Sequence, residues 1–389
     1  MTSALLDPER LVAQAKETTG PSDFGEDTWQ EGLERLTTAL REEAALNEIG
    51  VQVASGEILN YLGSRLQITD WLRRHPEAAS ADVTPPVVIV GQGRTGTTIL
   101  HDLLAQDPAH RVPLTWEVDR PLPPPEPETY ETDPRIAEVQ TQLGMTELLI
   151  PGFLPMHPIG ARHAQECVRI TACDFRSMIF PTQYRVPSYA CWLLEEAAMA
   201  PAYRWHRRFL QVLQARHRRP RWVLKSPAHV WCLGALLHEY PNALLVQTHR
   251  DPLRIIASLA SLLSTLRRLA TDESPIPQGA AEFSPYLIDG LDRSVTARLD
   301  GTVPPDRVVD VHFRDFMADP FATIRNVYEH LGLALSADAE SRMRAFLAAH
   351  PQDEHGRHQY TFADTGLDLA EWRERARRYQ EHFGVASEI

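Results

Sequence analysis

A glycine-rich loop at residues 91–98 joins a short apolar run to a helical stretch, and this junction constrains the fold more than any other feature. Residues 86–90 read PVVIV, the loop reads GQGRTGTT, and residues 97–105 have helical character. A β-branched apolar run of this length is typical of a parallel strand buried on both faces. Backbone N–H groups of such a loop and of the following helix can cradle a phosphate. The junction therefore predicts an α/β fold with an anion site at a strand end.

Three further apolar runs have the same strand-like pattern. They lie at residues 222–225, 243–248 and 308–311, and the first two precede helical stretches. Strands that alternate with helices predict a central parallel sheet covered by helices on both faces, a three-layer α/β fold. Residues 270–285 are predicted to form a long surface loop.

The rest of the chain is predicted to be helical. Residues 1–84 have apolar residues at helical spacing, notably in TWQEGLERLTTALREEAAL and over residues 51–73, and form an amino-terminal extension. The α/β domain is expected at 85–389. Within it, residues 121–221 form a helical insert that opens with PLPPPEP. Inserts of this size usually shape a substrate site at the carboxyl ends of the strands.

The loop fits three patterns that predict different ligands. As GxGxxG it could bind a dinucleotide, but the segment HRVPLTWEVDRPLPPP that follows has prolines where the second strand would lie. As a Walker A loop it has Thr97 in place of the lysine that bridges the β and γ phosphates of ATP. The third pattern needs a single phosphate, held by backbone N–H groups, by the Thr97 and Thr98 hydroxyls and by Arg94. The third pattern is favoured.

A second anion site is predicted after the strand at 243–248. Arg250 follows this strand directly, Asp251 and Pro252 are suited to begin a helix, and Ser258 lies eight residues after Arg250. In the alternative interpretation Arg250 and Asp251 pair across a turn and Ser258 is a small helix residue, but together with the glycine-rich loop a second anion site is favoured.

These motifs resemble those of the sulfotransferases that use 3′-phosphoadenylyl sulfate (PAPS). The loop is similar to the family's 5′-phosphosulfate loop, and Arg250 with Ser258 is similar to its 3′-phosphate element. The resemblance implies a P-loop NTPase-like fold, a bacterial cytosolic enzyme and transfer of a sulfuryl group from PAPS to an acceptor hydroxyl, with PAP as product. It implies these donor-binding residues: Gly93, Arg94, Thr95, Gly96, Thr97, Thr98, Arg250, Ser258, and Arg357 with His358 in a carboxyl-terminal basic loop.

The resemblance also implies catalytic roles. Lys225, which ends the strand at 222–225, and Arg94 are expected to stabilise the sulfuryl group and the departing phosphate. Two residues are candidates for the base. Glu117 lies close to where tyrosylprotein sulfotransferases have a catalytic glutamate, and His229 lies two positions later than the histidine of the steroid and phenol enzymes. Glu117 is slightly favoured, but the choice stays open. Glu166 and His163, in the insert, could face the acceptor, but the favoured interpretation is an ordinary helix surface.

Composition limits the other classes of function. The formal charge of -13 disfavours nucleic-acid binding. No apolar run is long enough to span a bilayer, and neither a CxxC pair nor a signal segment is present, so we expect reduced thiols and a cytoplasmic location. The histidines lack the Cys or carboxylate partners of a metal cage, and no metal is predicted.

The acceptor and the assembly are only partly predicted. The aromatic insert suits a small hydrophobic molecule or a lipid, and a homodimer is left open. Two alternative functions remain at this point: a phosphotransferase or kinase of P-loop architecture, and a nucleotide-binding interaction protein without catalysis.

Overall fold

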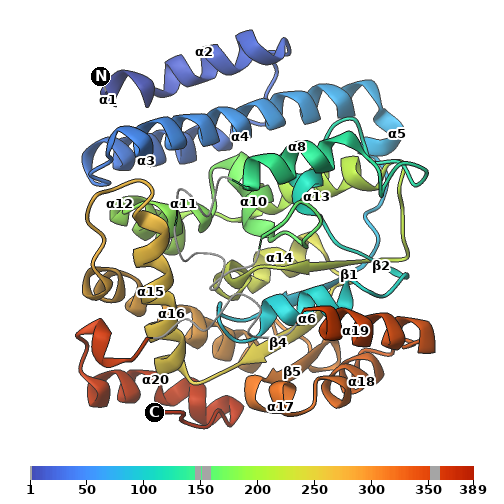
Figure 1. Cartoon of the computed structure of the whole chain (residues 1–389), viewed down its shortest axis with the longest axis vertical. Coiled ribbons are helices and arrows are strands. Elements are labelled where there is room, and N and C mark those ends of the chain that lie inside the picture. Colours follow the sequence, from blue (N-terminus) through green and yellow to red (C-terminus); the bar gives the residue numbers. More distant parts are fainter. Residues whose placement is uncertain (1, 145–149, 151–158, 351–359) are drawn as a thin grey trace.

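Five parallel strands form the centre of the molecule (Figure 1). The computed structural model describes residues 2–144, 150, 159–350 and 360–389. In space the strands follow the order β2-β3-β1-β4-β5, and every neighbouring pair is parallel. Their bounds are β1 Pro86–Val90, β2 His110–Arg111, β3 Arg221–Lys225, β4 Leu244–His249 and β5 Val308–His312. The three-layer α/β fold with a parallel sheet is thereby confirmed.

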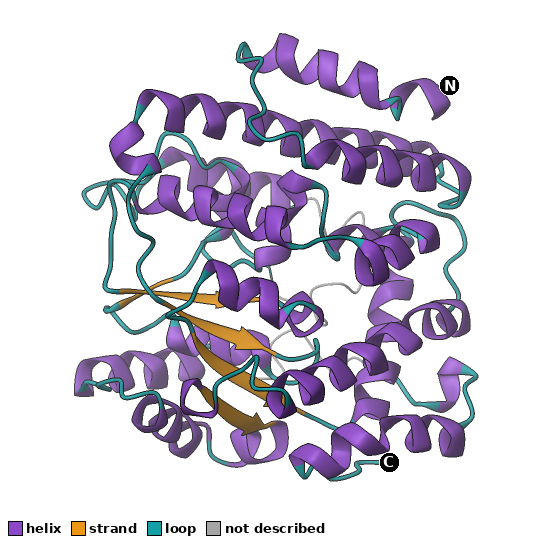
Figure 2. Ribbon diagram, turned by 180° about the vertical axis from the view of Figure 1, so that it is seen from behind, coloured by secondary structure: helices purple, strands orange, loops and turns teal. Residues whose placement is uncertain are grey.

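The side chains of β1 explain why the sheet is covered on both faces. Val87 and Ile89 belong to one apolar core, while Val88 and Val90 belong to another. Successive side chains of a strand point to opposite faces, so a strand that is apolar throughout needs a helical layer on each side. The helices around the strands form these layers (Figure 2).

Helices α6 and α18–α19 pack on one face of the sheet, and α13–α16 contribute to the core on the other. The bounds in the first group are α6 Thr97–Leu104, α18 Pro320–His330 and α19 Ala337–Ala349. Those in the second are α13 Ala200–Gln214, α14 Leu233–Glu239, α15 Pro252–Arg267 and α16 Ile276–Leu299. The carboxyl-terminal part also contains the short helix α17 Phe313–Ala318 and the last helix, α20 Leu369–Phe383.

The amino-terminal helices lie at the end of the molecule opposite α20 (Figure 1). They are α2 Pro8–Thr19, α3 Trp29–Glu42 and α4 Glu48–Arg74. Arg65 of α4 forms a buried ion pair with Asp174 of the insert at 3.0 Å and donates a hydrogen bond to the carbonyl oxygen of Phe24. Separating Arg65 from Asp174 would leave a buried charge without a partner, which is costly. The ion pair therefore stabilises the packing of the amino-terminal helices against the insert.

The insert consists of short helices. Their bounds are α8 Pro134–Leu143, α10 Cys167–Thr171, α11 Ile179–Gln183 and α12 Pro187–Cys191, followed by the longer α13. Helix α7 Thr115–Asp119 precedes them. The loop expected at 270–285 is shorter than predicted, because α16 begins at Ile276 and includes Pro285. The amino-terminal half of α16 packs against α15 at small residues such as Gly279, where the nearest side chain is that of Leu263.

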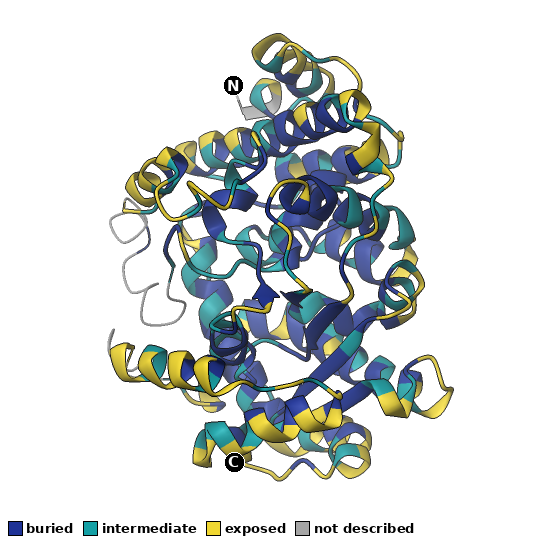
Figure 3. Cartoon of the chain, turned by 90° about the vertical axis from the view of Figure 1, so that its right-hand side faces the viewer, coloured by how far each residue is buried: buried dark blue, intermediate teal, exposed yellow. Residues whose placement is uncertain are grey.

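Burial is concentrated in the strands and in the helices that flank them, while the outer faces of the carboxyl-terminal helices are exposed (Figure 3). Within the described part of the chain, none of the helices combines the length and the apolar character that crossing a bilayer requires.

Three buried histidines make the fold sensitive to acid. Burial lowers the pKa of each of His101, His206 and His229 to about 3. Below pH ~6.5 the unfolded chain binds protons at these imidazoles and the native chain does not, so the free energy of unfolding falls as the pH falls. We expect the three histidines to lower the free energy of unfolding by about 4 kcal/mol between pH 7.5 and 5.5. Urea denaturation at both pH values measures the loss, and His206→Gln should remove about a third of this contribution. Equal stability at both pH values would contradict the prediction.

Candidate active site

The glycine-rich loop is held against β4 by close backbone contacts. Gly91 has a φ of 131°, and a Cβ there would lie 2.3 Å from the Thr248 hydroxyl oxygen. Gly96 has a φ of 87° and precedes α6. Only glycine adopts such angles without strain, and at Gly91 no side chain fits. Arg94 also has a positive φ, 70°, which is unusual for a residue with a side chain and marks a constrained site.

Some residues of the loop contact β4, and others line a cavity. The Thr95 hydroxyl is buried, donates to the Gln92 carbonyl oxygen at 2.7 Å and lies 2.6 Å from the Thr248 hydroxyl. It therefore fixes the loop to β4, and a contact from Thr95 to a nucleotide would have to come from its backbone. Gly93, Thr97 and Thr98 instead line a cavity.

The second predicted anion site meets the first one. The Arg250 guanidinium donates to the Arg94 carbonyl oxygen at 3.0 Å, and Nε of Arg94 donates to the Ser258 hydroxyl at 2.9 Å. The pKa of Arg94 is lowered, chiefly by burial and further by the nearby charge of Arg250. Two guanidinium groups whose charges interact in this way are stabilised by an anion placed between or beside them. The structure thus brings the two motifs into contact.

A carboxylate already lies beside one of these guanidinium groups. Glu388, near the carboxyl end of the chain, accepts from Nε of Arg250 at 3.0 Å and lies 3.6 Å from Arg254. Its backbone N–H donates to Asp251 at 2.7 Å. Asp251 also caps α15 as predicted, accepting from the backbone N–H of Leu253. The position next to Arg250 is thus suited to an anion.

Lys225 and Glu166 form an ion pair at the carboxyl end of β3. Nζ of Lys225 also donates to the Thr98 hydroxyl at 3.3 Å, which links the pair to the first turn of α6. The Lys225 side chain is 1% exposed, while that of Glu166 is 19% exposed. Glu166 directly precedes α10 and is 59 residues from Lys225 in the sequence. No sequence pattern links these two residues. The sequence suggested that Glu166 is an ordinary surface residue, whereas in the structure its side chain lies beside Lys225.

A cavity of about 370 Å³ adjoins the loop and this ion pair. Arg94, Thr98 and Glu166 line its polar part. Much of the rest of its wall is aliphatic, and includes Leu143, Ile150, Ile159, Ile179, Leu259, Leu262, Leu266 and Leu269, while Asp119, Arg169, Thr182 and Gln183 are polar residues of the same wall. A cavity with one polar, cationic part and a long apolar wall can orient an amphipathic molecule with its polar end at the loop.

Glu117, the favoured base, does not reach this cavity. Thr115 and Asp119 of α7 line it, and Glu117 lies between them in the sequence on the opposite face of the helix. There its fully buried carboxylate pairs with Arg111 at 2.5 Å and accepts from the Tyr130 hydroxyl at 3.0 Å. Burial raises the pKa of Glu117, opposed in part by the charge of Arg111. This position favours a structural role for Glu117.

The remaining predicted residues lie elsewhere. His229 is buried in the middle of a short 3-10 helix, Pro227–Trp231, and lines a second cavity rather than the one at the loop. Arg357 and His358 lie outside the described residues. Among residues 2–144, 150, 159–350 and 360–389, no three His, Cys, Asp or Glu side chains gather as a metal site would require.

Known proteins share this architecture. Residues 85–337 match the model of the sulfotransferase family. The sulfotransferase STF1 of Mycobacterium tuberculosis H37Rv is 32% identical to this chain and superposes with a TM-score of 0.83. The match covers 95% of this chain and 97% of the STF1 chain. STF9 of Mycobacterium avium is 31% identical, with coverages of 98% and 97% and a TM-score of 0.89. A curated relative in Mycobacterium bovis, omega-hydroxy-beta-dihydromenaquinone-9 sulfotransferase Stf3, is 29% identical over 79% of this chain and 77% of its own.

The chain belongs to the sulfotransferase family and is a transferase that moves a sulfuryl group to an acceptor. The resemblance to the sulfotransferase family is thereby confirmed. The phosphotransferase and the non-catalytic interaction protein are set aside, because the family model matches residues 85–337 and the two solved sulfotransferases named above match this chain over nearly their full length.

Proposed function

We propose that the protein transfers the sulfuryl group of PAPS to a hydroxyl group of a hydrophobic molecule, with a lipid as the favoured acceptor. The observation that supports this most strongly is the contact between the two anion-binding motifs. Arg250 bonds to the backbone of Arg94, and Arg94 bonds to Ser258, next to a cavity that is polar at the loop and apolar beyond it. PAPS carries phosphate at two separate positions, the 5′ and the 3′ position of its ribose, whereas the phosphates of ATP form one chain at the 5′ position. Two linked cationic sites therefore suit PAPS better than ATP.

The donor would be held by both motifs. Backbone N–H groups of the loop and the start of α6, with the Thr97 and Thr98 hydroxyls, are suited to the 5′-phosphosulfate. Arg250 and Ser258 are suited to the 3′-phosphate, because a guanidinium can bind phosphate oxygens in a bidentate fashion. The roles proposed for Arg357 and His358 in covering the nucleotide rest on the family resemblance alone.

Glu166 is our proposal for the base. Its carboxylate lines the cavity beside Lys225, whereas Glu117 is paired with Arg111 behind α7. Glu166 would accept the acceptor's hydroxyl proton while the oxygen forms a bond to sulfur. The bond between sulfur and the bridging phosphate oxygen breaks, and its electron pair stays on the phosphate of PAP. Lys225 would then move from Glu166 towards that oxygen and stabilise the charge that develops there.

The nature of the acceptor is inferred from the cavity wall. Four leucines from α15 and the residues after it line one side, at positions 259, 262, 266 and 269. Their spacing of three and four residues presents a continuous aliphatic stripe, which suits a flexible hydrocarbon chain. The relative in Mycobacterium bovis is named for an omega-hydroxylated menaquinone, a lipid with a terminal hydroxyl, and this supports the same class of acceptor here.

The proposal is tested by incubating the purified protein with ³⁵S-labelled PAPS and a panel of acceptors. We expect transfer to long-chain alcohols and to omega-hydroxy isoprenoid lipids, and little transfer to hydrophilic peptides or sugars. Label on peptides alone would contradict the lipid acceptor while leaving the donor assignment intact. Failure to bind PAP, together with binding of ATP and Mg²⁺, would contradict the donor assignment.

The contact between Glu388 and Arg250 gives a further prediction. A 3′-phosphate on Arg250 must displace the Glu388 carboxylate, so removing that carboxylate should favour the nucleotide. We expect Glu388→Ala to tighten PAP binding about fivefold by calorimetry, an effect of about 1 kcal/mol. AMP, which lacks the 3′-phosphate, should bind both proteins equally. Glu381→Ala, at an exposed position of α20, is the matched control. Weaker PAP binding by Glu388→Ala would mean that Glu388 supports the site rather than competes for it.

A further inference from the structure

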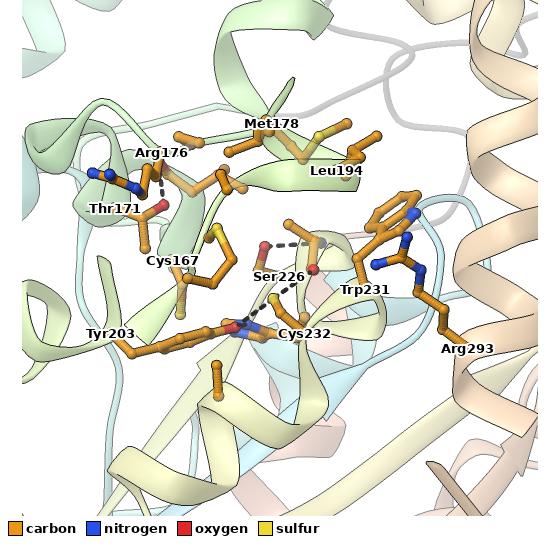
Figure 4. Close-up of a pocket in the computed structure, with 18 residues that line it drawn as sticks. Cys167, Thr171, Arg176, Met178, Leu194, Tyr203, Ser226, Trp231, Cys232 and Arg293 are labelled. Atoms are coloured by element: carbon orange, nitrogen blue, oxygen red, sulfur yellow. Dashed lines mark hydrogen bonds between the residues drawn. The ribbon is translucent and has the colours of Figure 1, made fainter. Parts of the chain in front are cut away.

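The cavity at the loop has polar residues in its wall that a hydrocarbon chain does not need. They come from α7, α10 and α11, and are Asp119, Arg169, Thr182 and Gln183. The boundary with the second cavity, which is drawn in Figure 4, has a different character. The side chains that line both cavities are Val168, Met178, Ala228 and Trp231. Since polar groups are costly to bury without hydrogen bonds, the bonds made by the four polar residues show where a ligand is needed.

Contacts within the protein occupy two of these four residues. The Thr182 hydroxyl donates to the Met178 carbonyl oxygen at 3.0 Å, and the Gln183 amide donates to the Glu57 carboxyl group at 3.0 Å. Oε1 of Gln183 is buried without a partner in the described part of the chain, so no ligand can reach it. Thr182 and Gln183 are therefore weak candidates for binding a ligand.

Asp119 and Arg169 form an ion pair that leaves one polar atom open on each side chain. Oδ1 of Asp119 accepts from Nη2 of Arg169 at 2.6 Å, and the two side chains are 14% and 25% exposed. Among the residues that the structure describes, Oδ2 of Asp119 and Nη1 of Arg169 have no hydrogen-bond partner, and both atoms are accessible. Because both residues line the cavity, the pair offers it one hydrogen-bond acceptor and one donor.

This ion pair lies one helical turn from the proposed base. The backbone N–H of Arg169 donates to the carbonyl oxygen of Glu166 at 3.1 Å. Side chains three positions apart on a helix are neighbours, with about 5–6 Å between their Cβ atoms. On α7, Thr115 and Asp119 are four positions apart and both line the cavity. A hydroxyl group at Glu166 and a second polar group at the ion pair would therefore belong to the same end of one molecule.

The charges of the pair select the kind of polar group. An anionic group would be repelled by Asp119 and a cationic group by Arg169, because the two charges lie side by side. The neighbouring Glu57 carboxyl group is bonded to Tyr184, and burial raises its pKa, which favours its neutral form. A hydroxyl group both donates and accepts, so it can bond to the open atoms of Asp119 and Arg169 together.

We propose that Asp119 and Arg169 bind a second hydroxyl group of the acceptor, close to the hydroxyl that receives the sulfuryl group. The acceptor is then a lipid whose polar end is a diol and whose hydrocarbon chain lies along the leucines of α15. This assignment deepens the function proposed above and rests on it, whereas binding of a diol does not require sulfuryl transfer. Asp119 and Arg169 determine specificity and take no part in proton transfer.

Binding is tested without a donor by ligand-observed NMR titration of 1-octanol and 1,3-octanediol. The wild type should bind the diol about tenfold more tightly, the effect of an added hydrogen bond to a charged group. The double variant Asp119→Leu/Arg169→Met removes both charges and leaves neither of them unpaired, and it should lower this ratio below twofold. If the double variant does not fold, Asp119→Asn, which keeps the shape of the side chain, should lower the ratio at least threefold.

The matched control is the double variant Asp70→Leu/Arg74→Met. Asp70 is 18% exposed, pairs with Arg74 at 2.8 Å and does not line the cavity. This variant makes the same chemical change in an ion pair of similar exposure, so it should keep the tenfold ratio. A loss of the ratio in the control as well would overturn the assignment to Asp119 and Arg169.

The outcomes separate the subsite from the proposed function. Equal binding of the alcohol and the diol by the wild type, or a tenfold ratio that persists without the ion pair, would overturn the subsite. With labelled PAPS, the wild-type kcat/KM should be about tenfold higher for the diol, and Asp119→Leu/Arg169→Met should lose this preference. Diol binding that depends on the ion pair, without any transfer, would refute the proposed function and leave the subsite intact. Transfer without a preference for the diol would overturn the diol acceptor and leave the proposed function intact.

Discussion

Replacing Glu166 by glutamine is expected to lower kcat about 1,000-fold. A positioned general base contributes ~10²- to 10⁴-fold to a rate, and glutamine has nearly the same shape but does not accept a proton. Glu166 lines the cavity beside Lys225, so its loss should affect the reaction more than the binding of the donor. Transfer of labelled sulfate at saturating PAPS and acceptor measures kcat, and calorimetry with PAP should give a dissociation constant changed by no more than a few-fold.

Glu117→Gln is the matched comparison, because it makes the same chemical change in a carboxylate that is buried away from the cavity. Breaking its pair with Arg111 should cost about 3 kcal/mol of folding stability. The kcat of the folded fraction should remain within about twofold of the wild type, a difference below ~0.5 kcal/mol in barrier height. A full rate in Glu166→Gln combined with a large loss in Glu117→Gln would return the role of base to Glu117.

Arg250→Ala is expected to weaken PAP binding about 100-fold. Removing one partner of a hydrogen-bonded charge pair costs ~2–5 kcal/mol, and a factor of 100 corresponds to ~2.7 kcal/mol. The side chain is positioned for such a contact, since it bonds to the Arg94 backbone on one side and to the Glu388 carboxylate on the other. Calorimetry with PAP measures the change.

AMP separates the loss of the phosphate contact from general damage to the loop. It has no 3′-phosphate, so its affinity should fall far less than that of PAP in Arg250→Ala. Ser258→Ala should give a smaller loss for PAP, because it removes a neutral hydroxyl rather than a cation. An equal loss for AMP and PAP would show that Arg250 acts only by supporting the Arg94 carbonyl.

The strands and the two anion-binding motifs could be predicted from the sequence because their signals are local. A run such as PVVIV has no polar residue to face solvent, and glycine at position 91 or 96 is needed for a backbone angle that other residues disfavour. The helix cap at Asp251 is likewise a matter of adjacent residues. The long loop expected at 270–285 was misjudged because its prolines and glycine suggested irregular structure. Packing against α15 instead stabilises a helix from Ile276.

The candidate base was less predictable because it depends on which face of a short helix turns inward. The sequence places Glu117 at a reasonable distance after the loop, yet α7 directs Thr115 and Asp119 to the cavity and Glu117 to Arg111. Glu166 reaches Lys225 from a different segment, and a separation of 59 residues leaves no periodic signal.

The sequence alone thus determined the class of the fold and the loop between β1 and α6, and it indicated Arg250 and Ser258 as a second anion-binding motif. These follow from hydrophobic period, backbone angles and local helix-start residues. Only the tertiary structure decided which carboxylate lies beside Lys225, that Glu388 bonds to Arg250, and that His229 belongs to a separate pocket. Each of these depends on contacts between segments distant in the chain, where the packing of the whole core sets the orientation of a side chain.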